Sequence, residues 1–355
     1  MKRLFALLLA TVMVVGLTAC GSKTTPDADS QPGTEVSDDN PLGLAEKITI
    51  SYSHVQSTSS ATHRAMEDFG NYMNEKSNGW VTLEIFPAGQ LYNDSTEIDA
   101  ILGGNIDMVS TYMSKLTSVD TATQYCLAPY LFDNVDEMEG FYTSEYALPL
   151  YEKINALGLK VVNVMFGGEQ YFMSNGDSIR TIDGFKGKKV REGGGDMTKA
   201  LYDALGASVT TVSFNELYTA MQTKMVDIAV TSIDSAVNIQ LQETLKSVSA
   251  YKIQYAPYLI MFNQQKWDSY PENVQQLITD GLELARVKQL EYTNEGCAAA
   301  IETVKAACDF YEASDEEIAQ LKALWQPIVE QYVDSSWIDA VWKCQEMCSR
   351  ETPKI

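Results

Sequence analysis

Arg191 is the residue of this sequence best suited to recognise a small anion. It ends the short stretch 187–191 (Gly-Lys-Lys-Val-Arg), which precedes a glycine run and reads as a strand within a compact α/β unit. Arginine is always charged and presents a planar fork that matches a carboxylate. In open α/β sheets, ligands bind beyond the carboxyl ends of the strands. The sequence therefore predicts a carboxylate contact at Arg191, against the alternative of a purely structural ion pair.

Further candidates for the same site follow other predicted strands. Tyr112 and His54 each come after a strand end and can face a ligand, whereas His63 is expected on a helix surface. Phe214 is another candidate, although an aromatic residue is more often part of a core. The glycine run 193–195 fits neither Gly-x-x-x-x-Gly-Lys nor Gly-x-Gly-x-x-Gly. We interpret it as a mobile loop beside the cleft rather than a phosphate site.

The elements that must position these residues alternate between strands and helices. Apolar patterns of period two, or short continuous apolar runs, predict strands at 47–52, 81–86, 106–109, 160–164, 209–212 and 228–231. Helical spacing predicts helices at 62–75, 95–102 and from 271 to about 308. Alternation of this kind is typical of a mainly parallel sheet covered by helices on both faces.

Two helix starts carry the Ser-x-x-Glu pattern of a capping box. Ser213 with Glu216 is one, and Ser314 with Glu317 is the other. In such a box the serine and glutamate side chains each accept a backbone N–H of the other residue. We therefore expect helices to begin at both places.

The N-terminus has the features of an export signal. A basic start precedes an apolar run over 4–17 that is too short to span a bilayer and is followed at once by polar sequence. Leu-Thr-Ala-Cys at 17–20 resembles the bacterial lipobox, which predicts lipidation of Cys20, and two acyl chains suffice for stable anchoring. We thus expect a lipoprotein signal peptide at 1–20, a flexible linker at 21–45, and an extracytoplasmic body that is lipid-anchored to the cell membrane.

The composition limits the partners. The chain has 26 Lys and Arg against 48 Asp and Glu, a formal net charge of −22. A strongly acidic surface argues against nucleic acid as a partner. Apart from Cys20, the cysteines are Cys126, Cys297, Cys308, Cys344 and Cys348. Their pairing is open. We interpret them as buried or idle thiols rather than a metal site, because two thiolates at 344 and 348 do not complete a zinc shell.

Several motifs occur along the body in the order typical of one family. They are Phe-Pro-Ala-Gly-Gln-Leu at 86–91, Gly-Gly-Asn-Ile-Asp-Met at 103–108, Ala-Pro-Tyr-Leu-Phe at 128–132, the stretch 187–227, and Trp267 followed by Pro-Glu-Asn-Val-Gln at 271–275. On these motifs, residues 46–335 resemble the substrate-binding proteins of tripartite ATP-independent periplasmic (TRAP) transporters, of the dicarboxylate-binding DctP-like type.

The resemblance implies an α/β, two-lobed periplasmic-binding-protein-like fold with crossing strands and a long hinge helix. Approximate boundaries are 46–168 plus 257–296 for lobe I and 169–256 plus 297–340 for lobe II, with a C-terminal tail at 341–355. It further implies that a ligand closes the lobes and that the closed form docks on a TRAP membrane permease. A closing ligand must bind the closed state better than the open one.

The resemblance also assigns ligand-binding roles. Arg191 matches the arginine that pairs with the ligand carboxylate, and Phe214 matches an aromatic residue lining the pocket. Gln170 stands where the family often has a second basic contact, and Thr231 stands where it has an asparagine. The remaining departures are Gly193 in place of a proline and Ile253 near a frequent histidine. One retained arginine with altered neighbours favours a monocarboxylate over a C4-dicarboxylate.

Three functions remain open from the sequence. The first is a lipoprotein that captures a small organic acid for a TRAP transporter. The second is a sensor lipoprotein that presents its ligand to a receptor. The third is an extracellular hydrolase, which the absence of a Gly-x-Ser-x-Gly elbow and of His-rich metal spacing disfavours. We expect no enzyme activity, no cofactor and no metal.

Overall fold

A computed structural model describes residues 37 and 39–351 of the chain. The predicted signal peptide, Cys20 and most of the predicted linker lie outside these residues. Asn40 and Leu44 are buried, and the Asn40 side chain bonds both the N–H and the C=O of Leu44 at 3.0 and 2.9 Å. The packed part of the chain therefore begins before residue 46.

Ten strands form one sheet within the described residues. They are β1 (Ile48–Ser53), β2 (Val81–Phe86), β3 (Met108–Tyr112), β4 (Leu159–Ser174), β5 (Lys189–Arg191), β6 (Ser208–Thr210), β7 (Ile228–Ser232), β8 (Ser247–Ala250), β9 (Tyr255–Asn263) and β10 (Asp309–Glu312). The main path runs β2-β1-β3-β9-β4-β7-β5-β6, and β8 pairs with both β4 and β10.

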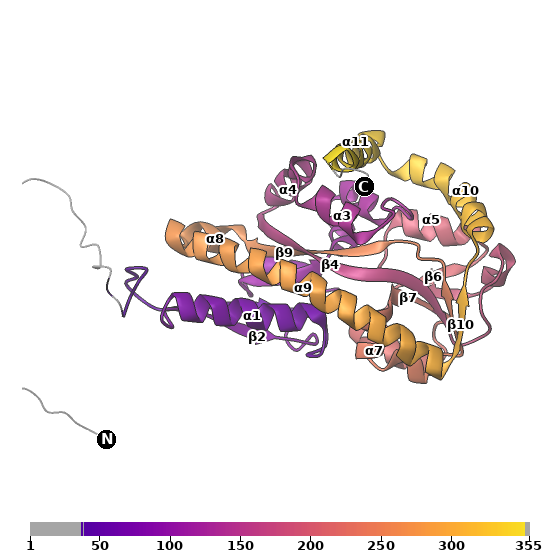
Figure 1. Ribbon diagram of the computed structural model, residues 1–355, viewed down its shortest axis with the longest axis horizontal. Coiled ribbons are helices and arrows are strands. Elements are labelled where there is room, and N and C mark those ends of the chain that lie inside the picture. Colours follow the sequence, from indigo (N-terminus) through magenta and orange to yellow (C-terminus); the bar gives the residue numbers. More distant parts are fainter. Residues whose placement is uncertain (1–36, 38, 352–355) are drawn as a thin grey trace, which may run out of the picture. The chain divides into compact units, whose positions relative to one another are not determined.

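The helices cover this sheet (Figure 1). They are α1 (Ala61–Lys76), α2 (Glu97–Leu102), α3 (Val135–Tyr142), α4 (Leu148–Asn155), α5 (Asp196–Ala204), α6 (Leu217–Gln222), α7 (Ile233–Asn238), α8 (Gln264–Ser269), α9 (Glu272–Ala307), α10 (Asp315–Tyr332) and α11 (Ser335–Glu351). Within residues 39–351, no helix combines the length and apolar character needed to cross a bilayer.

The sheet is mixed rather than mainly parallel, which corrects the expectation from the sequence. β1 is parallel to β2 and β3, and β5 is parallel to β6 and β7, as βαβ units require. β4 and β9, in contrast, run antiparallel to each other and to their neighbours β7, β8 and β3. β4 and β9 lie between the parallel group β1, β2 and β3 and the parallel group β5, β6 and β7. This pairing joins segments far apart in the chain, so the alternation of strands and helices along the sequence does not reveal it.

β4 is far longer than the strand expected at 160–164. It continues through Gly167 and Gly168, residues that usually weaken a strand. Here close packing requires them. A Cβ atom at Gly168 would lie 2.6 Å from Cys297 Sγ, and one at Gly167 would lie 3.1 Å from the Cβ of Ala256. Glycine therefore allows β4 to pass between its neighbours.

The long helix expected after Trp267 is present as α9. It packs on α1, on β4 and on α7 (Figure 1). Gly281 permits the close approach to α1, because a Cβ atom there would lie 2.8 Å from the ring of Tyr72. Further along, the Gln289 amide donates to the Phe166 carbonyl at 2.9 Å and accepts from the Phe166 N–H at 3.0 Å. The helix thus contacts α1, which connects β1 to β2, and also α7, which follows β7.

The two predicted capping boxes have different outcomes. At α10, Ser314 and Glu317 form the reciprocal pair as predicted. The box at Ser213 and Glu216 is wrong, because the Ser213 hydroxyl donates instead to Asp94 at 2.7 Å and to Asn215 at 2.6 Å. The Ser213 hydroxyl thus bonds the carboxylate of Asp94, which is distant in sequence, rather than the backbone N–H of Glu216.

The segment expected as a C-terminal tail belongs largely to α11. Val341 and Cys344 on this helix are buried, and α11 packs on α3. Trp337 stacks on Tyr125 with ring centroids 5.0 Å apart. The predicted thiols fit this picture in part, since Cys126 and Cys344 are buried while Cys297 and Cys308 are half-buried.

Candidate functional site

Arg191 is buried at the carboxyl end of β5, as the sequence predicts. β5 lies between the parallel strands β6 and β7, and only 5% of Arg191 is exposed. Its Nε donates to the Val212 carbonyl at 3.0 Å, which fixes the orientation of the guanidinium plane. The Phe214 ring lies beside it, with 6.0 Å between Cζ and the ring centroid. Among the described residues, the two Nη atoms have no hydrogen-bonded acceptor, so the fork remains available.

The guanidinium group lines a small cavity with a volume of about 30 Å³, room for about two water molecules. Five of the six predicted ligand residues line it, namely Tyr112, Gln170, Arg191, Phe214 and Thr231. They come from β3, β4, β5, the turn after β6, and β7. The other lining residues are Val55, Gln56, Asp94, Glu97, Lys115, Glu192, Gly193, Val230 and Tyr258.

His54 is the predicted ligand residue that does not line this cavity. It is fully buried, stacks on Tyr52 with ring centroids 5.2 Å apart, and its Nε2 lies 3.1 Å from His63 Nδ1. Burial, with the neighbouring His63 acting in the same direction, lowers the pKa of His54 to about 3. The expectation that His63 lies on a helix surface is also wrong, because this ring turns inward to His54.

The sequence analysis missed a second cation in the cavity, Lys115. It lies in the 3₁₀ turn Met113–Ser118, just beyond β3. Its Nζ is 3.2 Å from Asp94 Oδ2 and donates to the Gly193 carbonyl at 3.0 Å. Met113 and Leu116 of the same turn are buried and fix its backbone. The only signal in the sequence is that this lysine lies three residues after the end of β3.

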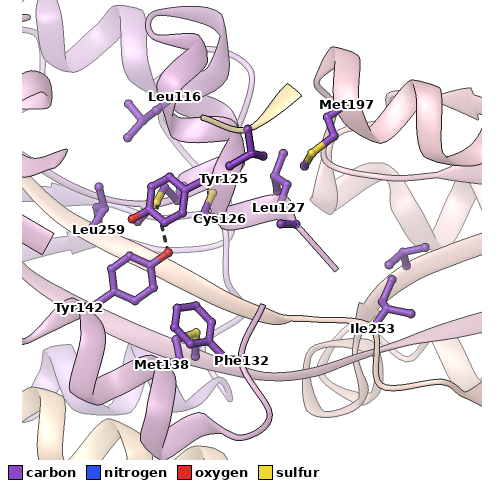
Figure 2. Close-up of a cluster of buried hydrophobic side chains, with 14 of the residues drawn as sticks. Leu116, Tyr125, Cys126, Leu127, Phe132, Met138, Tyr142, Met197, Ile253 and Leu259 are labelled. Atoms are coloured by element: carbon purple, nitrogen blue, oxygen red, sulfur yellow. Dashed lines mark hydrogen bonds between the residues drawn. The ribbon is translucent and has the colours of Figure 1, made fainter. Parts of the chain in front are cut away.

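The apolar packing behind this turn is shown in Figure 2. Leu116 lies in a cluster with Tyr125, Cys126 and Leu259. Ile253, which stands near a frequent histidine of the resembling family, belongs to the same cluster rather than to the cavity. Ile253 is therefore part of the hydrophobic core and contributes no ionisable group to the cavity.

Three buried acids share the cavity with the two cations. Asp94 is the central one, since Oδ1 accepts from Ser213 and Oδ2 pairs with Lys115 and, at 3.9 Å, with Arg191. Burial raises the pKa of Glu192, although Arg191 and Lys115 oppose this shift. Burial raises the pKa of Glu97 to about 8, with the Asp94 carboxylate acting in the same direction. Glu97 is consequently protonated at neutral pH.

An amide network closes another side of the cavity. The Gln254 amide donates to Gln170 Oε1 at 2.6 Å and to Glu192 Oε1 at 3.3 Å, and the Gln170 amide donates to the Tyr112 hydroxyl at 3.4 Å. Opposite, the Gln56 amide donates to the Tyr258 hydroxyl at 2.9 Å. These groups hold rigid donors and acceptors around a polar ligand.

The arrangement suits the binding of an anion. The described residues include no group of three or more His, Cys, Asp or Glu placed to hold a metal ion. Neither histidine reaches the cavity, so no imidazole base stands beside a nucleophile there. What the cavity does offer is a fixed arginine fork with surrounding hydrogen-bond partners, which suits recognition of a carboxylate.

Comparison with known proteins gives relatives along most of the chain. The C4-dicarboxylate-binding protein DctB of Bacillus subtilis is 23% identical over 299 residues, which cover 84% of this chain and 85% of that protein. In structure, the chain is similar to a TRAP periplasmic solute-binding protein from Shewanella oneidensis with bound succinate (TM-score 0.80, 20% identity, 84% of this chain and 99% of that chain).

A second similar structure is the sugar acid binding protein DctPAm from Advenella mimigardefordensis in complex with galactonate. Its TM-score is 0.82 at 20% identity, with 85% of this chain and 99% of that chain covered. These similarities show a common fold. They confirm the predicted α/β class with crossing strands and a long helix.

A family match completes the comparison. The family described as bacterial extracellular solute-binding protein, family 7 (DctP), matches residues 52–336. Its members bind solutes and are not enzymes, which agrees with the expectation from the sequence. The chain belongs to bacterial extracellular solute-binding protein family 7.

Proposed function

We propose that this protein captures a small organic acid in the cavity at Arg191 and delivers it to a TRAP-type membrane permease. The observation that carries the proposal is the state of Arg191. This residue is buried and oriented by Val212, and neither of its Nη atoms has a hydrogen-bonded acceptor among the described residues. A carboxylate accepts two parallel hydrogen bonds from such a fork. Gln170, Thr231, Tyr112 and Phe214 would contact the rest of the ligand.

Relatives support an acid as the ligand. Family members from Bacillus subtilis and Rhodobacter capsulatus are named C4-dicarboxylate-binding proteins, and a third from Escherichia coli is named for 2,3-diketo-L-gulonate. Each of these ligands carries at least one carboxylate. The shared element is therefore the carboxylate that the arginine fork would bind, while the remainder of the ligand differs among relatives.

We further propose two lobes that close on the ligand, at about 46–168 plus 257–296 and 169–256 plus 297–340. The pairing of β4 supports this division, since it pairs with β9 up to Glu169 and with β7 from Gln170 onward. Asp94 and Lys115 come from the first lobe, and Arg191 and Gly193 come from the second. A ligand held among them would favour the closed state by its differential affinity.

Anchoring and delivery complete the proposal. The lipobox-like sequence before Cys20 supports a lipid anchor on the outer side of the cell membrane, which would keep the protein near its permease. Mass spectrometry of the membrane-extracted protein tests the anchor. A mature N-terminus at Cys20 with added acyl mass is expected, and an unmodified cysteine would contradict it.

A thermal-shift screen of organic acids tests the binding function. A ligand that binds only the folded state raises the free energy of unfolding by mass action, by about 2.7 kcal/mol at a concentration of 100 times Kd, and so raises the thermal midpoint. The screen should include monocarboxylates, sugar acids, keto acids and dicarboxylates. Stabilisation by at least one acid is expected, and stabilisation only by uncharged solutes would contradict the proposal.

A further inference from the structure

We propose that the ligand carries a protonated amine as well as its carboxylate, and that Glu97 binds the amine. The inference rests on the proposed function, because it takes a carboxylate bound at Arg191 as given. It concerns the opposite end of the ligand, for which the motifs of the sequence give no residue.

The first argument is the balance of charge in the cavity. Two cations, Lys115 and Arg191, share it with three acids, Asp94, Glu97 and Glu192, and all five side chains are largely buried. A monocarboxylate adds a fourth acid, and a dicarboxylate adds a fifth. Buried charges without partners are costly. A zwitterionic ligand brings a positive charge together with its carboxylate, so the ligand itself adds no net charge.

The second argument is that, within the described residues, Glu97 alone among these acids has neither an ion pair nor a hydrogen bond of normal length, and the Thr111 hydroxyl beside it also lacks one. Asp94 bonds Ser213 and pairs with Lys115, and Glu192 accepts from Gln254 and from the Gly194 N–H at 3.3 Å. Glu97 is completely buried, yet neither of its carboxyl oxygens has a hydrogen bond among the described residues. Buried polar groups are normally satisfied, so an unsatisfied carboxyl group that lines a cavity points to a ligand donor.

The third argument concerns the position that a second ligand carboxylate would need. Within the part of the chain that the structure describes, Lys115 is the only other cation lining the cavity, and it already contacts Asp94 and the Gly193 carbonyl. A second carboxylate would displace these contacts and approach the Asp94 carboxylate as a like charge. An ammonium group would instead donate to the Glu97 oxygens, and Glu97 would then ionise.

Calorimetric titration of the full-length protein with matched small acids tests the inference. The probes are glycine, β-alanine and γ-aminobutyrate, with the hydroxy acids and dicarboxylates of the same chain lengths as comparators. The series spans several lengths, so the separation of the two charged groups is itself varied. We expect at least one amino acid to bind about tenfold or more tightly than its hydroxy and dicarboxylate counterparts.

Variants at Glu97 connect this preference to the residue. Glu97→Gln keeps the shape of the side chain, and it should weaken binding of the preferred amino acid about tenfold or more. Glu84→Gln, at an exposed position of β2, is the matched control and should change nothing. If Glu97→Gln fails to fold, the wild-type protein still gives an answer. An ammonium group that ionises Glu97 releases its proton, and the binding enthalpy then depends on the buffer.

Asp94, Lys115 and Tyr52 lie near the same carboxyl group, so Glu97→Gln must remove the proton release if Glu97 is its source. The inference is overturned if a dicarboxylate or hydroxy acid binds as tightly as its amino counterpart. It is also overturned if no amino acid binds, or if Glu97→Gln leaves the affinity of the amino acid unchanged. Loss of binding of any screened acid in Arg191→Ala would still uphold the proposed function, so the two failures are distinguishable.

Discussion

Asp94 and Arg191 face each other in the buried cavity, with Asp94 Oδ2 3.9 Å from Arg191 Nη2. This separation is too long for a hydrogen bond, whereas the same oxygen lies 3.2 Å from Lys115 Nζ. Asp94 therefore balances the charge of both cations, and it leaves the arginine fork available to a ligand at hydrogen-bonding distance. The three residues connect the turn after β2, the turn after β3, and β5.

Asp94→Asn should destabilise the ligand-free protein. Removing one partner of a buried ion pair leaves uncompensated charge, which costs about 3 kcal/mol. Here both Lys115 and Arg191 would lose the negative charge of Asp94, while an asparagine oxygen can still accept from Ser213. Urea denaturation without ligand gives the difference. Asp99→Asn, at an exposed position of α2, is the control, and equal midpoints for the two variants would contradict the assigned role of Asp94.

Glu97 should make stability fall as the pH rises. Its pKa is raised to about 8 in the folded protein, from 4.5. The folded state therefore holds a proton that the unfolded state has lost. Its contribution is fully present below pH 4.5 and is lost as the pH rises to about 8, with a size on the order of a few kcal/mol. Urea denaturation of wild type and Glu97→Gln across this range should show the slope only in the wild type. Parallel pH profiles would show that Glu97 ionises normally.

His54 should remain neutral in mildly acidic solution. Its pKa is lowered to about 3, so His54 is protonated at a lower pH in the folded state than in the unfolded state. Stability from this group is present above about pH 6.5 and is lost as the pH falls toward 3. The chain has two histidines, so NMR can follow both rings directly. One ring should show no titration between pH 7 and pH 4. Two rings titrating near pH 6.5 would contradict the buried pair.

Gly193→Ala should weaken ligand binding. A Cβ atom there would lie 2.7 Å from Ser114 Oγ and 3.3 Å from Tyr112 Cε1, so the loop or the turn at Lys115 must shift. Overpacking of this kind costs about 1–3 kcal/mol, which corresponds to a loss of affinity of roughly tenfold. Gly184→Ala is the control, because the nearest atom to its Cβ, from Ile179, lies at 3.4 Å. Equal ligand affinities for the two variants would contradict this prediction, because they would show that the loop at Gly193 can shift without affecting binding.

The sequence predicted the residues whose position follows from a local strand end. Arg191 and Tyr112 each lie at or near the end of a strand, and strand patterns are readable from period and composition. The long helix α9 and the N-terminal cap of α10 were also predicted, because both depend on residues that are close together in the sequence. Gln170 and Thr231 were reached only through the resemblance. Gln170 lies inside β4, where no break in the sequence pattern marks it.

Residues that depend on distant partners were missed. Glu97 occupies the first turn of a short helix, where acids are common for local reasons, and only tertiary packing buries it beside Asp94 and Lys115. Ser213 matched a cap but bonds Asp94, which is 119 positions away. The inward turn of His63 and the passage of β4 through two glycines likewise depend on neighbours that no local pattern contains.

The central claim is that Arg191 binds the ligand carboxylate, and calorimetry on Arg191 variants tests it most directly. With the acid that gives the largest shift in the screen, Arg191→Ala should abolish measurable binding, and Arg191→Lys should also weaken it because a point charge replaces the fork. Arg180→Ala, which removes an exposed arginine, should bind as the wild type does. An Arg191→Ala protein that is folded and binds the acid with unchanged affinity would contradict the account.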